Sequence, residues 1–177
     1  MNMQGEQRIV ASREVVWAAL NDPDVLKAAI PGCQEITKTS DTDMTAKVKL
    51  KIGPISATFG GKVTLSDLDP PNGYTISGEG SGGVAGFAKG GAQVRLVEEG
   101  PDTTLLTYDV KADVGGKIAQ LGSRLIDATA KKLAGEFFDN LADVVAPPEP
   151  TVEEAPAEGE APKKKGWFRA MFAKKEG

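Results

Sequence analysis

The side chains that most often carry out enzyme chemistry are absent or isolated in this sequence. No histidine occurs among the 177 residues, which removes the commonest general base and the commonest metal ligand. The single cysteine, Cys33, can form neither an internal disulfide nor a cysteine-rich zinc site. Carboxylates such as Asp67, Asp69 and Glu79 fall in expected turns or on a charged strand face, and no pair is set apart as an acid and a base. We therefore predict that the chain is not an enzyme.

One glycine-rich stretch matches a nucleotide-binding pattern by spacing alone. Residues 78–83 satisfy G-x-G-x-x-G, and Glu98 lies near the spacing of a ribose-binding acid. The pattern binds a pyrophosphate only where a strand precedes it and a helix follows it. Another strand is expected after these glycines, so we reject a nucleotide site.

Glycine and alanine dominate two neighbouring strands of the expected sheet. The glycines are Gly78, Gly80, Gly82, Gly83, Gly86, Gly90 and Gly91. Glycine weakens a strand unless the chain bends sharply or another group approaches the backbone closely. Curvature alone would explain them. We favour a second explanation, in which a ligand occupies the space of the missing side chains, and this predicts an apolar cavity with few polar anchors.

The predicted walls of this cavity come from the sheet and from a long helix. The sheet contributes Met44, Val48, Phe59, Val63, Phe87 and Tyr108, and the helix contributes Leu121, Leu125, Ile126, Thr129 and Leu133. Any one of these side chains could equally be ordinary core. The hydroxyl groups of Tyr108 and Thr129 could donate a hydrogen bond to a carbonyl oxygen of the ligand.

A helix expected over residues 116–145 positions the second set of walls. Its apolar residues repeat at steps of three or four and lie on one stripe, which comprises Ile118, Leu121, Leu125, Thr129, Leu133, Phe137, Leu141 and Val145. At 1.5 Å per residue such a helix is roughly 40 Å long. A partner helix of ordinary length cannot cover it, so it needs a sheet.

The preceding residues supply that sheet. Residues 33–114 alternate with a period of two between turn signals, which predicts about six antiparallel strands. Before them a first strand ends at residues 9–11, a short helix over 13–20 follows an N-cap at Ser12, and a second short helix covers 23–30. This order predicts an α+β helix-grip fold, in which a curved antiparallel sheet of about seven strands wraps around the long C-terminal helix, with two short helices after the first strand.

Several short motifs occur together in the first four-fifths of the chain. They are Trp17 after Val15-Val16, Asp22-Pro23, Ile30-Pro31-Gly32-Cys33, Ile52-Gly53-Pro54-Ile55, and Gly115-Gly116-Lys117-Ile118-Ala119 with Leu121-Gly122. In these motifs the chain resembles the CoxG family of carbon monoxide dehydrogenase subunits over residues 3–145. The resemblance implies the START-like (SRPBCC) helix-grip fold and association with an aerobic molybdenum carbon monoxide dehydrogenase or a related molybdenum hydroxylase. It offers no catalytic residues to carry over.

The composition changes sharply after Val145 and divides the chain into three parts. We expect a ligand-binding domain over 1–146, a flexible linker of proline, alanine and glutamate over 147–162, and a tail over 163–177. The tail holds six basic residues and one acid, a net charge of +5, and the linker holds five glutamates. Because the whole chain carries −4, the domain also carries −4.

The tail combines an aromatic face with a basic one. Trp167, Phe168, Met171 and Phe172 gather on one side of a helix, flanked by Lys163, Lys164, Lys165, Arg169, Lys174 and Lys175. An anionic membrane surface attracts each base by about 1 kcal/mol, so we predict reversible membrane binding. Lysines with aromatic residues also bind nucleic acid, and the tail could fill a groove on a partner protein. The acidic domain favours the membrane.

These features together predict a function. The polar amino terminus and the absence of a long apolar run place the chain in the cytoplasm, peripheral on the inner face of the cell membrane. The family resemblance suggests, in addition, a carrier that binds an isoprenoid quinone, menaquinone or ubiquinone, and delivers it to the dehydrogenase, which it recruits to the membrane. No covalent cofactor, metal or nucleic acid is expected. A plain tether without a ligand, a carrier of another lipid and an assembly factor for the molybdenum enzyme remain open.

Overall fold

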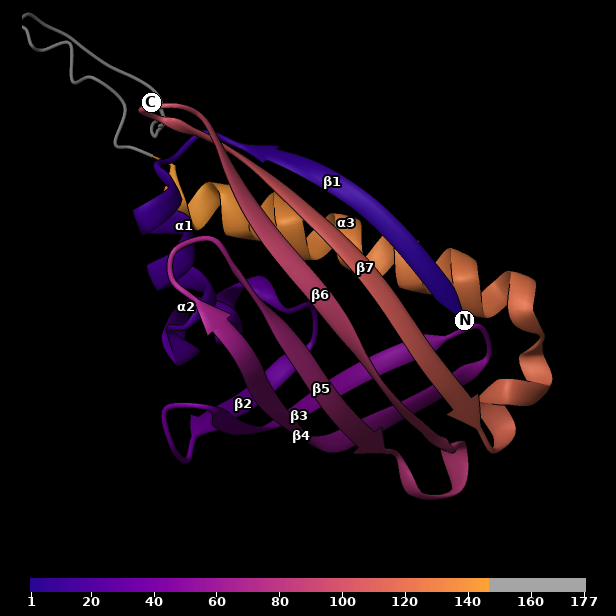
Figure 1. The fold of residues 1–177 in the computed structure, drawn as a ribbon. Helices are drawn as coiled ribbons and strands as arrows, with labels where there is room; N and C mark the ends of the chain where they lie inside the picture. The colour runs from indigo at the N-terminus through magenta and orange to yellow at the C-terminus, as the bar shows by residue number, and fades with distance from the viewer. Residues whose placement is uncertain (147–177) are drawn as a thin grey trace, which may run out of the picture. The chain divides into compact units, whose positions relative to one another are not determined.

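The computed structural model describes residues 1–146 (Figure 1). The segments predicted as linker, 147–162, and membrane-binding tail, 163–177, lie outside the described residues. The elements are β1 (Asn2–Ile9), α1 (Arg13–Leu20), α2 (Pro23–Ala29), β2 (Cys33–Lys38), β3 (Asp43–Ile52), β4 (Ile55–Asp69), β5 (Gly73–Ser81), η1 (Gly83–Ala85), β6 (Phe87–Gly100), β7 (Thr103–Gly115), η2 (Lys117–Leu121) and α3 (Ser123–Val145).

All seven strands form one antiparallel sheet in the order β1-β7-β6-β5-β4-β3-β2. The helices α1 and α2 lie together at one end of the sheet, and α3 runs along it (Figure 1). The connection between β5 and β6 and the short helix η2 lie at the opposite end. The α+β helix-grip prediction, with two short helices after the first strand and a long helix at the end, is confirmed.

The two short helices begin where their capping residues predict. The Ser12 hydroxyl accepts a hydrogen bond from the backbone N–H of Val15 at 3.2 Å, and Asp22 caps α2 by accepting from the N–H of Asp24 at 2.9 Å. Pro23 occupies the first turn of α2, where its missing N–H costs nothing. The Asn140 side chain then ties α3 to α2 by donating to the carbonyl oxygen of Ala29 at 3.0 Å.

The long helix begins later than its apolar periodicity predicts. Residues 117–121 form a separate 3₁₀ turn, and Gly122, with φ of +95°, separates this turn from α3. At Gly116, φ is +80° and a Cβ would lie 2.5 Å from the Cα of Gly86, so the chain can turn here only with glycine. The 23 residues of α3 give a helix of about 34 Å rather than 40 Å.

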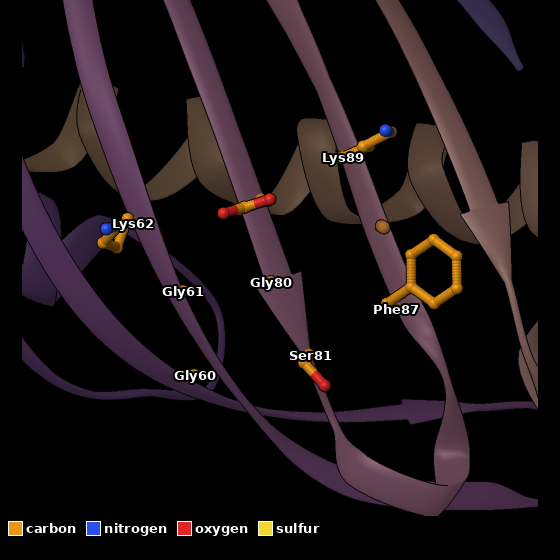
Figure 2. Close-up of a pocket in the computed structure, with 9 residues that line it drawn as sticks. Gly60, Gly61, Lys62, Gly80, Ser81, Phe87 and Lys89 are labelled. Atoms are coloured by element: carbon orange, nitrogen blue, oxygen red, sulfur yellow. The ribbon is translucent and has the colours of Figure 1, made fainter.

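Strand pairing fixes which residues share a face of the sheet. On the inward face Met44 pairs with Val63, which pairs in turn with Gly78. On the outer face Lys62 pairs with Glu79, which pairs with Lys89. Figure 2 shows this outer face, with the long helix behind the strands.

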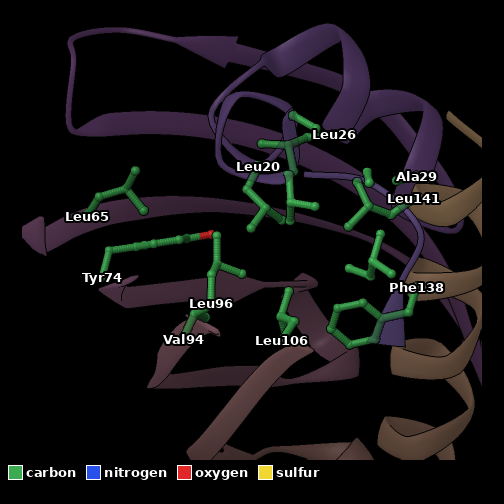
Figure 3. Close-up of a cluster of buried hydrophobic side chains, with 14 of the residues drawn as sticks. Leu20, Leu26, Ala29, Leu65, Tyr74, Val94, Leu96, Leu106, Phe138 and Leu141 are labelled. Carbon is green, nitrogen blue, oxygen red and sulfur yellow. The ribbon is translucent and has the colours of Figure 1, made fainter. Parts of the chain in front are cut away.

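The buried core occupies the part of the inward face beside α1 and α2. Side chains of both short helices, such as Leu20 and Leu26, meet sheet residues and the last turns of α3 (Figure 3). The large members of this cluster are Ile9, Val16, Leu20, Leu26, Met44, Leu65, Tyr74, Val94, Leu96, Leu106, Phe138 and Leu141. The remainder of the inward face, towards the η1 and η2 end, lies outside this cluster.

Candidate functional site

Apolar side chains on the rest of the inward face remain partly exposed. On the sheet they are Val48, Leu50, Ala57, Phe59, Ala88, Ala92, Val110 and Ala112, and on η2 and the first half of α3 they are Leu121, Leu125, Ile126, Thr129 and Leu133. We call this surface the open half. None of these residues belongs to the buried cluster or to the set packed against it. This inward apolar surface is partly exposed and lies outside the buried cluster, so it is a candidate ligand site.

Seven of the eleven predicted wall residues lie in the open half. They are Val48, Phe59, Leu121, Leu125, Ile126, Thr129 and Leu133. The turn between β3 and β4 approaches this part of the helix, because a Cβ on Gly53 would lie 2.8 Å from Cδ2 of Leu125. The fold thus places the predicted wall residues of the sheet and of the helix on the same, inward side of the sheet. Their contact with a ligand remains a prediction.

Three other predicted wall residues lie on the core side. Met44 belongs to the buried cluster, and Val63 and Tyr108 pack against it. The Tyr108 ring stacks on Phe138 with centroids 5.3 Å apart and an interplanar angle of 24°. Gly5 leaves room for the Tyr108 hydroxyl, because a Cβ at this position would collide with it. Tyr108 therefore stands at the border between the core and the open half.

Phe87 does not belong to the walls, and its prediction is wrong. It pairs with Ser81 and Gly115 and lies one residue out of phase with Ala88, which faces inward. The Phe87 side chain points to the outer face and is 47% exposed. Its ring covers Gly115, where a Cβ would collide with it.

Of the two predicted hydrogen-bond donors, one is already engaged. The Thr129 hydroxyl donates to the carbonyl oxygen of Leu125 at 2.8 Å, one helical turn earlier. Its proton is therefore satisfied within α3, and only its lone pairs remain to accept a bond. Tyr108 remains the candidate donor from the predicted set.

Close backbone approach explains most of the strand glycines. A Cβ on Gly61, Gly90 or Gly91 would collide with a carbonyl oxygen of the neighbouring strand, and a Cβ on Gly82 would lie 2.7 Å from the Phe59 ring. At Gly80 the nearest atom would lie at an ordinary 3.7 Å. These glycines are therefore explained by close contact with neighbouring strands and with the Phe59 ring. The argument for a ligand cavity rests instead on the partial exposure of the open half.

The ionisable groups with clearly shifted pKa values lie on turns, edges and the core. Hydrogen bonds from Ser40 and Thr64 lower the pKa of Asp43, and the Arg8 guanidinium lowers the pKa of Glu99. Burial raises the pKa of Tyr74, which meets Trp17 edge to face at a centroid distance of 5.3 Å. None of these three groups belongs to the open half.

The lone cysteine lies closer to the site than its sequence context indicates. Cys33 pairs with Val48, so the two side chains share a face at the edge of the open half. Burial raises the pKa of the Cys33 thiol, and its Sγ–H donates weakly to the carbonyl oxygen of Glu35 at 3.5 Å. The sequence offers only one clue to this location, which is the position of Cys33 after the Pro31-Gly32 turn. Alternation along β2 does not predict it, because the register shifts between Cys33 and Glu35.

A depression of ≈ 370 Å³ lies on the outer face of β4, β5 and β6 (Figure 2). It is lined by Gly60, Gly61, Lys62, Glu79, Gly80, Ser81, Phe87, Ala88 and Lys89. Across residues 1–146, no helix is both long and apolar enough to cross a membrane. No group of three potential metal-ligating side chains comes together in the same residues.

Solved structures share this fold. A conserved protein from Geobacillus kaustophilus is 29% identical, with a TM-score of 0.78 over 82% of this chain and 95% of its own. A START superfamily protein from Mycobacterium smegmatis is 16% identical, with a TM-score of 0.63 over 81% and 96% of the two chains. The Zhui aromatase/cyclase from Streptomyces sp. R1128 is 12% identical, with a TM-score of 0.59 over 82% and 93%. At these last two identities the likeness concerns the fold alone, which is START-like.

Family comparison gives a more specific result. A search among curated proteins finds no match. The model of the CoxG family of carbon monoxide dehydrogenase subunits matches residues 5–146, which include every described strand and helix except the first residues of β1. The predicted resemblance is confirmed, and the chain belongs to the CoxG family of carbon monoxide dehydrogenase subunits, with a START-like (SRPBCC) fold.

Proposed function

We propose that this chain is a non-enzymatic carrier of an isoprenoid quinone, menaquinone or ubiquinone, for an aerobic molybdenum carbon monoxide dehydrogenase. It takes the quinone from the membrane into the open half of the grip and presents it to the dehydrogenase. Electrons from carbon monoxide oxidation reduce the quinone, so the redox chemistry belongs to the partner and the ligand. Family membership supports the association with the dehydrogenase.

The open half is the single observation that carries this proposal. Its apolar side chains face the interior and yet remain in contact with solvent. Covering such a surface with a prenyl chain gains roughly 25 cal/mol per Å² removed from water. A long, narrow and flexible apolar chain of this kind suits the space between a helix and a curved sheet. The Tyr108 hydroxyl, at the border with the core, is the candidate donor to a quinone carbonyl.

The proposed site of action is the inner face of the cell membrane. Quinones are dissolved in the bilayer, so the carrier collects its ligand at the membrane surface. The basic aromatic tail, which lies outside the described residues, supplies the attachment in this proposal. It gives the protein a cytoplasmic, peripheral location and recruits the dehydrogenase to its electron acceptor.

The proposal is tested by identifying what the protein carries. The full chain is purified, extracted with organic solvent, and the extract is analysed by mass spectrometry. We expect close to one quinone per chain. An empty extract would leave the plain tether or the assembly factor, and a different lipid would make the chain a carrier of that lipid.

A matched pair of substitutions on α3 connects the ligand to the open half. Thr129→Trp places a large ring in the open half, whereas Ala128→Trp places the same ring on an exposed position of the same helix. We expect Thr129→Trp to lower both quinone content and dehydrogenase-to-quinone electron flow by about tenfold or more, and Ala128→Trp to leave both unchanged. Equal behaviour of two folded variants would contradict the proposed site.

A further inference from the structure

The outer face of the sheet carries five lysines, none of which forms an ion pair within residues 1–146. Strand alternation points Lys47, Lys49, Lys51, Lys62 and Lys89 away from the core. The ion pairs found within residues 1–146 are Arg8 with Glu99 and Arg13 with Glu98, and neither involves these lysines. We call this surface the basic outer face. It stands out because the domain as a whole carries a net charge of −4.

The depression of ≈ 370 Å³ lies within this basic outer face. Glycines form its floor, and a Cβ on Gly60 would meet nothing within 4 Å, so the space is open. Phe87 stands at its rim with its ring held against Gly115. Val84, in the adjoining η1 turn, is 84% exposed. An exposed aromatic ring beside an open depression is the arrangement in which one protein anchors a side chain of another.

Glu79 distinguishes a protein partner from a membrane surface. It lies in the depression, between Lys62 and Lys89 in the pairing register. Two more carboxylates share this face, since Asp113 pairs with Lys89 and Glu35 pairs with Lys47. Anionic lipid headgroups would repel a carboxylate at the centre of the contact. A folded protein can place a basic group opposite Glu79 and carboxylates opposite the lysines.

We propose that the basic outer face is a docking surface for a partner protein. The partner presents an apolar side chain, ringed mostly by carboxylates, to the depression beside Phe87. Resting on the proposed function, we assign this partner as the carbon monoxide dehydrogenase. The docking contact lies on the outer side of the sheet and the proposed ligand site on the inward side, so the two sites can be tested separately.

Filling the depression tests the anchor. Gly60→Leu extends a side chain into open space and leaves the sheet backbone undisturbed, and Ser56→Leu adds the same side chain on the same strand and face, outside the depression. Binding of each full-length variant to purified carbon monoxide dehydrogenase is measured by biolayer interferometry. We expect Gly60→Leu to raise Kd by about tenfold or more and Ser56→Leu to leave it close to the native value.

Charge reversal tests the rim. Lys62→Glu is compared with Lys27→Glu, which makes the same change on the exposed surface of α2. We expect Lys62→Glu to weaken binding and to flatten the dependence of Kd on salt concentration, because one favourable charge contact becomes unfavourable. Native affinity in both Gly60→Leu and Lys62→Glu would overturn the proposal.

Two further measurements distinguish the docking surface from a membrane contact and from the proposed quinone site. Binding to vesicles of phosphatidylglycerol is expected to be the same for all four variants. A loss of vesicle binding by Lys62→Glu with unchanged dehydrogenase binding would identify a membrane contact and overturn the docking surface. The quinone content of Gly60→Leu is expected to equal that of the native chain. If no quinone is found in either protein while Gly60→Leu still fails to bind the dehydrogenase, the proposed function fails and the docking surface stands.

Discussion

Two adjacent glycines of β4 face opposite sides of the sheet and should respond oppositely to an added methyl group. A Cβ on Gly61 would collide with the carbonyl oxygen of Glu79, whereas a Cβ on Gly60 would meet nothing within 4 Å. We expect Gly61→Ala to lower the free energy of unfolding by about 1–3 kcal/mol. Gly60→Ala should raise it by about 0.4–1 kcal/mol by restricting the unfolded chain. Urea unfolding of both variants checks this, and equal values would contradict the curvature that the structure shows.

The single cysteine permits a clean measurement of one shifted pKa. Burial raises the pKa of the Cys33 thiol, so less thiolate is present at a given pH in the folded chain than in the unfolded chain. Because the thiolate is the reactive form, alkylation by iodoacetamide should rise with pH along a curve displaced to higher pH in the folded protein. The same chain in urea is the control. Coincident curves would show that Cys33 is not desolvated.

Residue-scale prediction succeeds where alternation can be counted without interruption. Val48 and Phe59 lie on β3 and β4 in phase with many other apolar residues, and both face inward as predicted. Phe87 follows a run of glycines and the η1 turn, across which the phase of β5 cannot be carried into β6. A glycine gives no indication of the face on which the next side chain falls. The assignment of Phe87 therefore needed the pairing register, which the sequence does not display.

At the scale of elements, α3 performs different tasks in its two halves. Its last turns pack into the core, with Leu141 fully buried, and its first half forms part of the open half, with Leu133 partly exposed. We expect Leu141→Ala to lower the free energy of unfolding by about 2–5 kcal/mol. Leu133→Ala should lower it by less than Leu141→Ala does, because Leu133 is partly exposed and lies outside the buried cluster. Equal losses in denaturant unfolding would show that the open half is packed as tightly as the core.

The starts of the helices show which local sequence signals are sufficient to predict a helix boundary. The start of α1 follows from Ser12, whose side chain makes the capping bond that its position predicts. The start of α3 does not follow from periodicity, because Ile118 and Leu121 keep the apolar spacing while belonging to a separate 3₁₀ turn. Gly122 separates the 3₁₀ turn from α3 but leaves the apolar spacing unchanged. Its positive φ is seen only in the structure.

At the scale of the whole molecule, the order of the helices and strands predicted more of the fold than any single motif did. A strand, two short helices, six strands and a long helix allow one compact arrangement, with the sheet curved around the last helix, and the structure has it. Whether that arrangement is filled depends on side-chain volumes summed across seven strands and on the curvature of each. These long-range quantities are not encoded in any one stretch, so the hollow that the sequence predicts from its glycines stays a prediction.

In the proposed mechanism the domain binds the ligand and the tail binds the membrane, and this gives the last prediction. Every described strand and helix ends by Val145, so a chain ending at Ala146 keeps the whole grip and loses only residues 147–177. The lost residues include the tail, 163–177, with a net charge of +5, and the linker, 147–162, with −5. In the proposed mechanism the six clustered bases of the tail, at about 1 kcal/mol each, provide the attraction to an anionic leaflet. The shortened chain should therefore stop floating with phosphatidylglycerol vesicles while its extract still contains quinone. Because the attraction is electrostatic, raising the salt concentration should release the intact chain from the same vesicles. Undiminished flotation of the shortened chain would place membrane binding in the domain itself and remove the tail from the mechanism.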